Sequence, residues 1–169
     1  MVIPQQHKES VLAQSCGICD AVEIVGERWS FLILRGAFNG LHHFEEFQAT
    51  LGIARNILSN RLSRLVEHGL LQRDPDPADR RKVIYRLTVK GRELLPALIA
   101  LRQWGERWIS GVPNNPVLVD RHDRRPVAPV RVLSEDGRPL SLAELAWIDR
   151  SEIVESGSPP SSSGDEHSR

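Results

Sequence analysis

Residues 55 to 64 contain short polar side chains at the spacing of one helix face, with an arginine at each end. Asn, Ser and Arg side chains can bond to the edges of bases in a DNA major groove. The alternative is a solvated helix surface, which is usually polar but mixes both signs of charge. In the stretch 54–67, Glu67 is the only acidic residue. The candidate base-reading residues are Arg55, Asn56, Ser59, Asn60, Ser63 and Arg64.

A second basic group is the segment "DRRK", in which Arg80, Arg81 and Lys82 are consecutive. Three such cations are able to lie along DNA phosphates or enter a minor groove, where charge neutralisation adds affinity without sequence preference. The alternative is a loop tip that is basic only for solubility. One short strand joins this segment to the preceding helix, so it has the position that a wing would have.

The two cysteines, in "CGIC", are a third candidate for chemistry. If this segment is helical, Cys16 and Cys19 lie on neighbouring points of one face. Three interpretations stay open: an inert buried pair, a redox pair, and half of a metal site. A metal would need two further ligands, and the adjacent His42 and His43 point in different directions. We therefore predict neither a metal site nor a cofactor.

Charge is distributed unevenly along a chain whose formal net charge is zero. Residues 53 to 92 hold ten Lys and Arg against four acidic residues, which suits an anionic partner. No apolar run approaches the ~20 residues that span a bilayer, and the N-terminus lacks the pattern of a signal peptide. We expect a cytoplasmic protein without membrane contact. Two cysteines cannot form a disulfide framework of the secreted kind.

Apolar periodicity predicts the elements that position these residues. Helices are expected at about 18–25, 28–38, 43–51 and 54–67. The strand-like runs "LLQRD" and "VIYRLT" are separated by "PDPADRRK", which indicates a hairpin with a long basic tip. A helix from about 89 to 110 follows, capped by Thr88 and kinked or broken at Pro96.

This order predicts a mainly α fold with a small β-hairpin wing (α+β): a winged helix-turn-helix, whose helix 54–67 can enter the major groove. Arg61 falls within the apolar sector of that helix. We expect it to pair with a carboxylate such as Glu45 or Glu46 rather than to read bases.

The expected organisation has four parts. Residues 1–15 form an N-terminal arm, 16–111 the winged-helix domain, 112–155 a small β-rich extension, and 156–169 a disordered tail. Within the extension, an Asp136–Gly137 turn would join a strand pair. Ser141 and Glu144 resemble a capping box that starts a short helix through Trp147.

The sequence resembles the HxlR-type bacterial transcription regulators, which are similar in architecture to MarR-type winged-helix dimers. The matching stretches, within residues 16 to 108, are "CGICDAVEIVGERWSFLILRGAFNG", "HFEEFQATLGIARNILSNRLSRLVEHGLL", "VIYRLT" and "TVKGRELLPALIALRQWGERW". No single motif is specific, but the combination is. Some longer relatives carry a small zinc ribbon in the extension. Here "RHDRR" and "SEDGRPL" hold no cysteine, so the extension would lack zinc.

The resemblance implies a homodimer that binds a pseudo-palindromic DNA operator, acting as a repressor. A helix with two Trp on an apolar stripe independently favours two-fold pairing, although both Trp could instead complete the monomer core. In some relatives the cysteine matching Cys16 senses oxidants or electrophiles, so an oxidant or small-molecule effector is expected. The candidate interface residues are Ile18, Val22, Leu98, Leu101, Trp104 and Trp108.

Two other functions compete with a DNA-binding regulator. A thiol oxidoreductase would use "CGIC", but such a motif normally starts a helix after a strand, and no strand is predicted before Cys16. We therefore expect no enzyme. A protein-interaction module built on a winged helix is harder to separate, because winged helices do both. DNA binding should weaken steeply with salt, which distinguishes the two.

Overall fold

The computed structural model describes residues 17–112 and 115–153. The predicted arm, the tail and Cys16 lie outside these residues. The chain divides into two units between Val132 and Leu133. Among the residues that the structure describes, no helix is long and apolar enough to cross a membrane.

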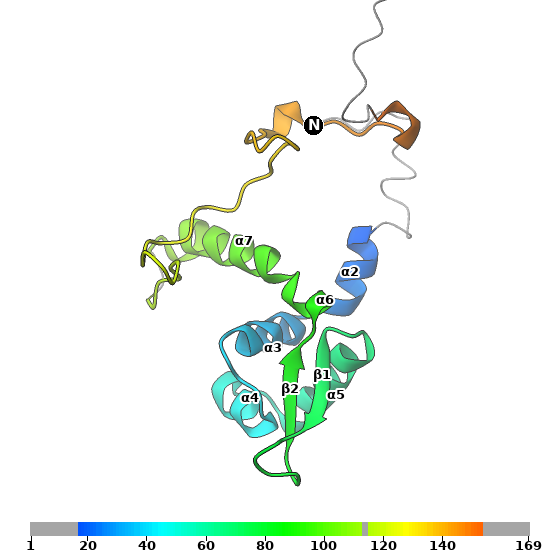
Figure 1. Ribbon diagram of the computed structural model, residues 1–169, viewed down its shortest axis with the longest axis vertical. Coiled ribbons are helices and arrows are strands. Elements are labelled where there is room, and N and C mark those ends of the chain that lie inside the picture. The colour runs from blue at the N-terminus through cyan, green and yellow to red at the C-terminus, as the bar shows by residue number, and fades with distance from the viewer. Residues whose placement is uncertain (1–16, 113–114, 154–169) are drawn as a thin grey trace, which may run out of the picture. The chain divides into compact units, whose positions relative to one another are not determined.

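Four helices begin the first unit: α2 (Gly17–Val25), α3 (Arg28–Phe38), α4 (Phe44–Leu51) and α5 (Arg55–Glu67). They agree with the predicted segments to within one or two residues. Helix α3 is apolar on most sides because it contacts α2, α4, α5 and the later elements β2 and α7 (Figure 1). It is the central helix of this unit.

The core lies where α3, α4 and α5 meet. Phe47 of α4 has no exposed surface, and Gly36 of α3 lies against its ring. A Cβ at Gly36 would stand 2.9 Å from Leu41 and 3.1 Å from the Phe47 ring, so the absence of a side chain lets the two helices approach closely. The other fully buried side chains of these helices are Ile33, Leu34, Leu58, Leu62 and Leu65.

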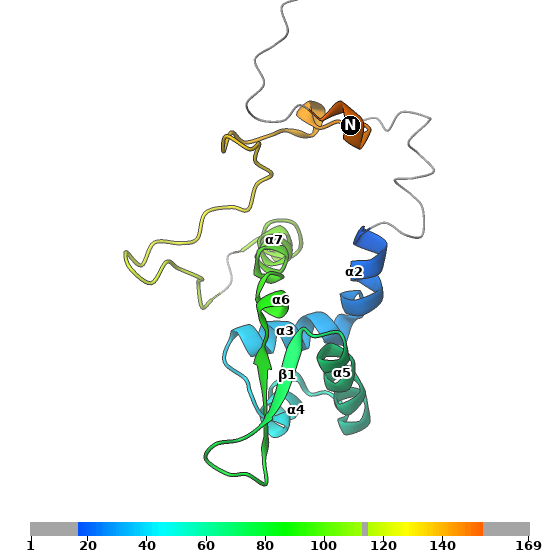
Figure 2. The same cartoon turned by 45° about the vertical axis from the view of Figure 1, so that its right-hand side comes forward.

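Strands β1 (Leu71–Pro75) and β2 (Val83–Leu87) form the predicted antiparallel hairpin, in which Leu71 is opposite Leu87. Buried Leu71 and Ile84 hold it to the helices. The connecting residues 76–82, which we call the wing, extend beyond the helices in both views (Figures 1 and 2). The basic tip is therefore presented away from the core.

Thr88 caps α6 (Val89–Arg92), as predicted: its hydroxyl accepts from the Gly91 amide at 3.0 Å and donates to the Gly69 carbonyl at 2.6 Å. The helix then breaks, and α7 (Leu95–Gly105) starts with Pro96 in its first turn. Proline is tolerated there because no helical carbonyl awaits its missing N–H. A π-helical turn, η1 (Glu106–Ser110), completes the element.

The segment 115–132 is anchored on α7 by side chains. Gln103 donates to the Ala128 carbonyl at 3.0 Å and accepts from the Val130 amide at 2.8 Å, and Arg102 donates to the Pro116 carbonyl at 2.7 Å. In place of a regular strand, this segment has one isolated bridge, between Val119 and Pro126. Prolines limit the ladder because they lack an amide donor.

The second unit begins at Leu133, with a turn in which Gly137 has a φ of 83° and Leu133 bridges to Pro139. The capping box is confirmed, because Glu144 accepts from the Ser141 amide at 2.8 Å. The helix through Trp147 is wrong: η2 (Leu142–Glu144) is a single 3-10 turn, after which Leu145 is extended. A second 3-10 turn, η3 (Arg150–Glu152), follows. Such short turns have little packing to propagate a helix.

Candidate nucleic-acid interface

Helix α5 presents the predicted polar face to solvent. The polar residues of this face, Asn56, Ser59, Asn60 and Ser63, are exposed, whereas Leu58, Leu62 and Leu65 on the opposite side are fully buried. Gly52, with a φ of 61°, ends α4 in the left-handed conformation, and the extended Ala54 leads into α5. Helices α4 and α5 thus form a helix-turn-helix, in which α5 is the second helix.

The two flanking arginines differ from each other in their surroundings. The Arg55 guanidinium lies over the Phe44 ring of α4, 4.9 Å from its centroid, at the first turn of α5. Arg64 is only half-exposed, because it donates to the Glu23 carbonyl at 3.4 Å and lies 4.0 Å from Glu27. Arg55 is thus the more available cation.

Arg61 pairs with Glu27, the residue that precedes α3, so the predicted partners Glu45 and Glu46 are wrong. The helical wheel correctly placed Arg61 toward the protein, but only the packing of α5 on α3 decides which carboxylate it meets. Within the described chain, Nε of Arg61 is buried without a hydrogen-bond partner. The ion pair fixes α5 against the start of α3.

Sequence reasoning missed Ile57. On a helical wheel Ile57 falls on the apolar side of α5, yet 37% of it is exposed, and it lines a shallow hollow with Asn56, Asn60 and Arg61. The sequence signal for this exposure is the position of Ile57 at the edge of the apolar stripe. An exposed apolar group between two amides is able to contact a thymine methyl group.

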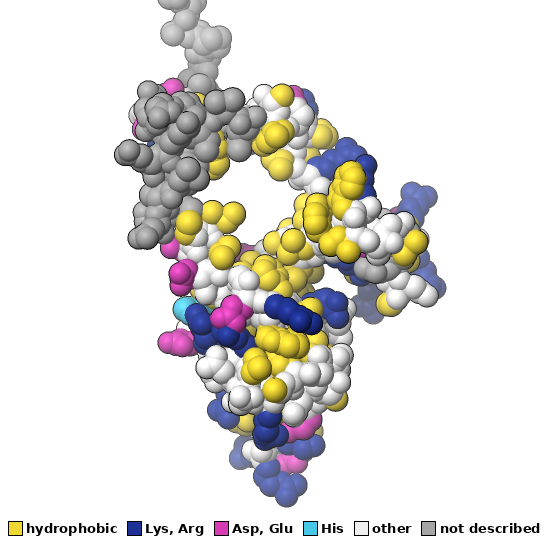
Figure 3. Space-filling view, turned by 180° about the vertical axis from the view of Figure 1, so that it is seen from behind, with side chains coloured by type: hydrophobic (Ala, Val, Ile, Leu, Met, Phe, Trp, Pro, Cys, Tyr) yellow, Lys and Arg dark blue, Asp and Glu magenta, His cyan; other side chains and the backbone are white. Residues whose placement is uncertain are grey.

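The wing is a hydrogen-bonded loop with a basic tip. Figure 3 shows Lys and Arg side chains gathered at its lower end, with acidic side chains between them. Arg80, Arg81 and Lys82 are all exposed. Asp79 accepts from Arg81 at 3.1 Å, and this side-chain hydrogen bond is the main cause of the lowered pKa of Asp79. Its carboxylate therefore stays charged and orients Arg81.

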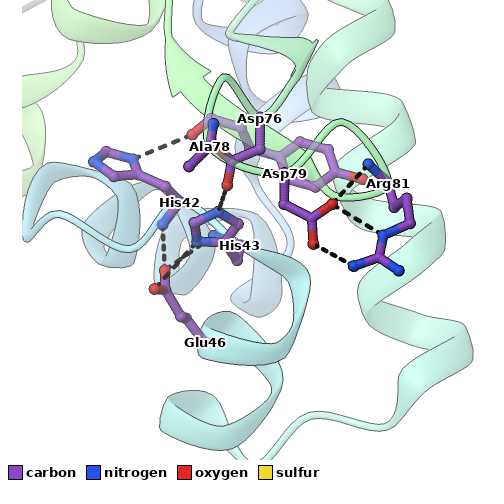
Figure 4. A network of polar contacts seen from close by, with 8 residues as sticks. His42, His43, Glu46, Asp76, Ala78, Asp79 and Arg81 are labelled. Atoms are coloured by element: carbon purple, nitrogen blue, oxygen red, sulfur yellow. Dashed lines mark hydrogen bonds and ion pairs between the residues drawn. The ribbon is translucent and has the colours of Figure 1, made fainter.

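His43 links the wing to the start of α4, and His42 contacts Tyr85 of β2, roles that the sequence did not indicate (Figure 4). His43 Nε2 lies 2.8 Å from Asp76 Oδ2, and its Nδ1 lies 3.2 Å from Glu46 Oε1. Hydrogen bonds from the His42 and His43 amides lower the pKa of Glu46 to about 2. In the described residues no group of three or more His, Cys, Asp or Glu could hold a metal ion.

The predicted dimer residues lie on α2, on α7 and, for Trp108, on η1. Helices α2 and α7 are at the end of the unit away from the wing (Figures 1 and 2). Trp104 and Trp108 are 56% and 68% exposed, so they do not complete the monomer core. Leu98 differs, because it packs partly against that core. The exposed members are Ile18, Val22, Leu101, Trp104 and Trp108.

Cys19 lies on α2 and is half-buried. Because Cys16 lies outside the described residues, the geometry of the thiol pair is not part of the structure. The redox interpretation therefore stays a prediction.

The helix-turn-helix followed by a hairpin wing defines the winged helix-turn-helix class. The family model for the HxlR-like helix-turn-helix matches residues 24–112. The chain belongs to this family, and the resemblance seen in the sequence is confirmed.

Three known proteins illustrate the relationship. An uncharacterised HTH-type transcriptional regulator of Mycobacterium tuberculosis, Rv3095, is 44% identical over 102 residues, 60% of this chain. The match spans only 65% of that protein. The crystal structure of PA1607, described as a candidate transcription factor, has a TM-score of 0.75 at 41% identity and covers 83% of this chain and 99% of its own. The oxidised redox regulator HypR is 26% identical, with a TM-score of 0.50, over 54% of this chain and 96% of its own.

Proposed function

We propose that this protein is a sequence-specific DNA-binding transcription regulator that acts in the cytoplasm, as a repressor. The observation that carries the proposal is the exposed face of α5, on which Asn56, Ser59, Asn60 and Ser63 stand, with Glu67 at the end of the helix as its one acidic residue. Short amides and hydroxyls on a helix that projects from a helix-turn-helix suit the floor of a major groove. The basic wing adds contacts to the DNA backbone.

We further propose that the regulator is a homodimer on a pseudo-palindromic operator. The exposed apolar side chains of α2 and α7 support this, since a second copy would remove them from water. Both helices lie opposite the wing, so pairing through them would leave each α5 free. Two-fold symmetry would then place two copies of α5 on half-sites about one helical turn apart.

The function is tested by selecting duplexes from a random pool and measuring the mass of the bound complex by sedimentation. We expect an inverted repeat occupied by two chains. Trp104→Asp should weaken dimerisation by at least ~100-fold, because a charge replaces a large apolar contact, and should weaken operator binding with it. A selected pool without any shared sequence would contradict specific recognition, and one chain per site would contradict the dimer.

The wing predicts a particular salt dependence. Replacing Arg80 and Arg81 with alanine should weaken binding to all duplexes alike and lower the slope of log affinity against log salt by about two units at most, since each lost phosphate contact removes about one. Fluorescence anisotropy across a salt series measures the slope. Arg121→Ala, in the exposed loop 120–125, is a matched control. An unchanged slope in the wing variant would show that the wing does not contact the DNA phosphates.

A second proposal concerns the effector: an oxidant that acts on Cys16 and Cys19. The position of Cys19 on α2, a candidate dimer helix, and the likeness to the redox regulator HypR favour it. A disulfide between residues three apart strains a regular helix, so its formation should distort α2 and change the half-site spacing.

We expect diamide, which takes two electrons and two protons from the thiol pair, to lower operator affinity at least ~10-fold, a loss of about 1.4 kcal/mol. Cys16→Ser and Cys19→Ser should each abolish the response. Mass spectrometry would establish that the thiols had reacted. Equal operator affinity of the oxidised and reduced protein would leave the two cysteines as packing residues.

A further inference from the structure

His43 connects two segments that are 33 residues apart in the sequence. It is the N-cap residue of α4, and its ring reaches Asp76, the first wing residue after β1, at 2.8 Å. Asp76 is 9% exposed and also accepts from the Ala78 amide at 2.8 Å, so its carboxylate shapes the first turn of the wing. Figure 4 shows the His43 ring between Glu46 and Asp76.

The two legs of the wing are held in different ways. The leg that enters β2 is fixed by backbone contacts: His43 pairs with Ile84 as a bridge, and the Tyr85 amide donates to the His42 carbonyl at 2.7 Å. The leg that leaves β1 pairs with the second leg, since Pro75 is opposite Val83 and the Asp76 amide donates to the Lys82 carbonyl at 3.0 Å. Its contact with the start of α4 is made by side chains, from His43 to Asp76. Loss of the His43 ring would therefore remove the side-chain link between the first leg and α4, and this leg would be held through its backbone pairing with the second leg.

We propose that His43 is a positioning residue for DNA binding: by fastening Asp76 to the start of α4, it fixes where the wing presents Arg80, Arg81 and Lys82 relative to α5. The inference rests on the proposed contact between wing and DNA. It adds to that contact a residue that does not itself touch DNA. Helix α4 is the first helix of the helix-turn-helix and packs against α5. The contact between His43 and Asp76 therefore fixes the position of the wing relative to α5.

The charges around His43 determine how the tie depends on pH. The carboxylates of Asp76, in the wing, and of Glu46, on α4, face the ring. Asp79 of the wing is close enough to Asp76 and to Lys82 to interact with both electrostatically. On the β2 side, His42 meets the Tyr85 carbonyl. The hydrogen bond to Asp76, followed by that to Glu46, raises the pKa of His43 above its ordinary value of 6.5. The hydrogen bond from Ala78, followed by that from His43, lowers the pKa of Asp76.

A raised histidine pKa means that the tie is complete when the pH is below 6.5, and that it is lost as the pH rises through the folded-state value. At the acid end, the lowered pKa of Asp76 keeps the carboxylate ionised. The wing should therefore be best positioned in mildly acidic solution, and its position should become less fixed as the pH rises through the raised pKa of His43.

The test uses the full-length protein, a random-sequence duplex, and the variants His43→Gln and Asp76→Asn. Asparagine keeps an oxygen that can accept from the Ala78 amide but removes the charge that attracts the imidazolium. We expect the wild type to lose about three- to tenfold in affinity between pH 6 and pH 8.5, the size of one or two phosphate contacts. Both variants should bind at pH 6 as the wild type does at pH 8.5. His122→Gln, at an exposed histidine in the loop 120–125, should retain the full pH dependence.

Two NMR measurements without DNA accompany the binding curves. The His43 imidazole should titrate at a lower pH in Asp76→Asn, and the Ala78 and Lys82 amides should exchange faster in both variants. If both variants kept the affinity, salt slope and pH profile of the wild type while the Arg80 and Arg81 variant lost affinity, the inference would be overturned and the proposed function kept. If the wild type bound no duplex, the proposed function would fail, and unchanged amide exchange would separately show that His43 does not hold the wing.

Discussion

Replacing Asn56 and Asn60 together with alanine is expected to abolish most of the preference for the selected operator. Each bidentate contact between asparagine and adenine contributes ~1–3 kcal/mol of discrimination, so the pair should account for roughly 2–6 kcal/mol. Both side chains are exposed on the outward face of α5. Alanine also favours a helix, so the fold should persist. Competition between the operator and a random duplex measures the change.

The random duplex separates base reading from backbone binding, because phosphate contacts position a protein and base contacts specify the site. Affinity for the random duplex should change little. Gln72→Ala removes an exposed amide from β1, where its partner is Asp74, and should leave both affinities unchanged. Equal losses on operator and random duplex in the Asn56 and Asn60 variant would show that α5 is not the reading helix.

Replacing Phe47 with alanine should cost ~3–5 kcal/mol in the free energy of unfolding. The ring is fully buried between helices, and Gly36 already lies against it, so the space left by the ring cannot close without moving α3. For a domain of this size the loss corresponds to a fall in melting temperature of roughly 15–30 °C. Urea unfolding followed by circular dichroism, at one fixed protein concentration, measures the change in the free energy of unfolding.

Phe44→Ala is the matched control, because it removes the same side chain from the same helix at a half-buried position. It should cost markedly less than Phe47→Ala. It should also release Arg55 from the ring on which the guanidinium lies, with little effect on unfolding. If the two variants unfolded at the same urea concentration, Phe47 would not be the centre of this core.

The sequence by itself determined the local elements, because their signals lie within a few residues. The run 28–38 is apolar on most sides and ends at "NG", and α3 has those bounds. The glycine after α5, the Thr88 cap and the proline in the first turn of α7 likewise marked ends and breaks correctly. The exposed polar face of α5 followed from the helical period alone.

Only the tertiary structure decided which distant groups meet. Arg61 was expected to find a carboxylate, but the choice of Glu27 depends on how α5 packs against α3. The link between His43 and Asp76 had no sequence signal, because it requires the wing to return beside the start of α4. A repeat of three or four residues fixes the face on which a side chain lies. It does not fix which element covers that face, since this depends on the relative placement of elements far apart in the chain.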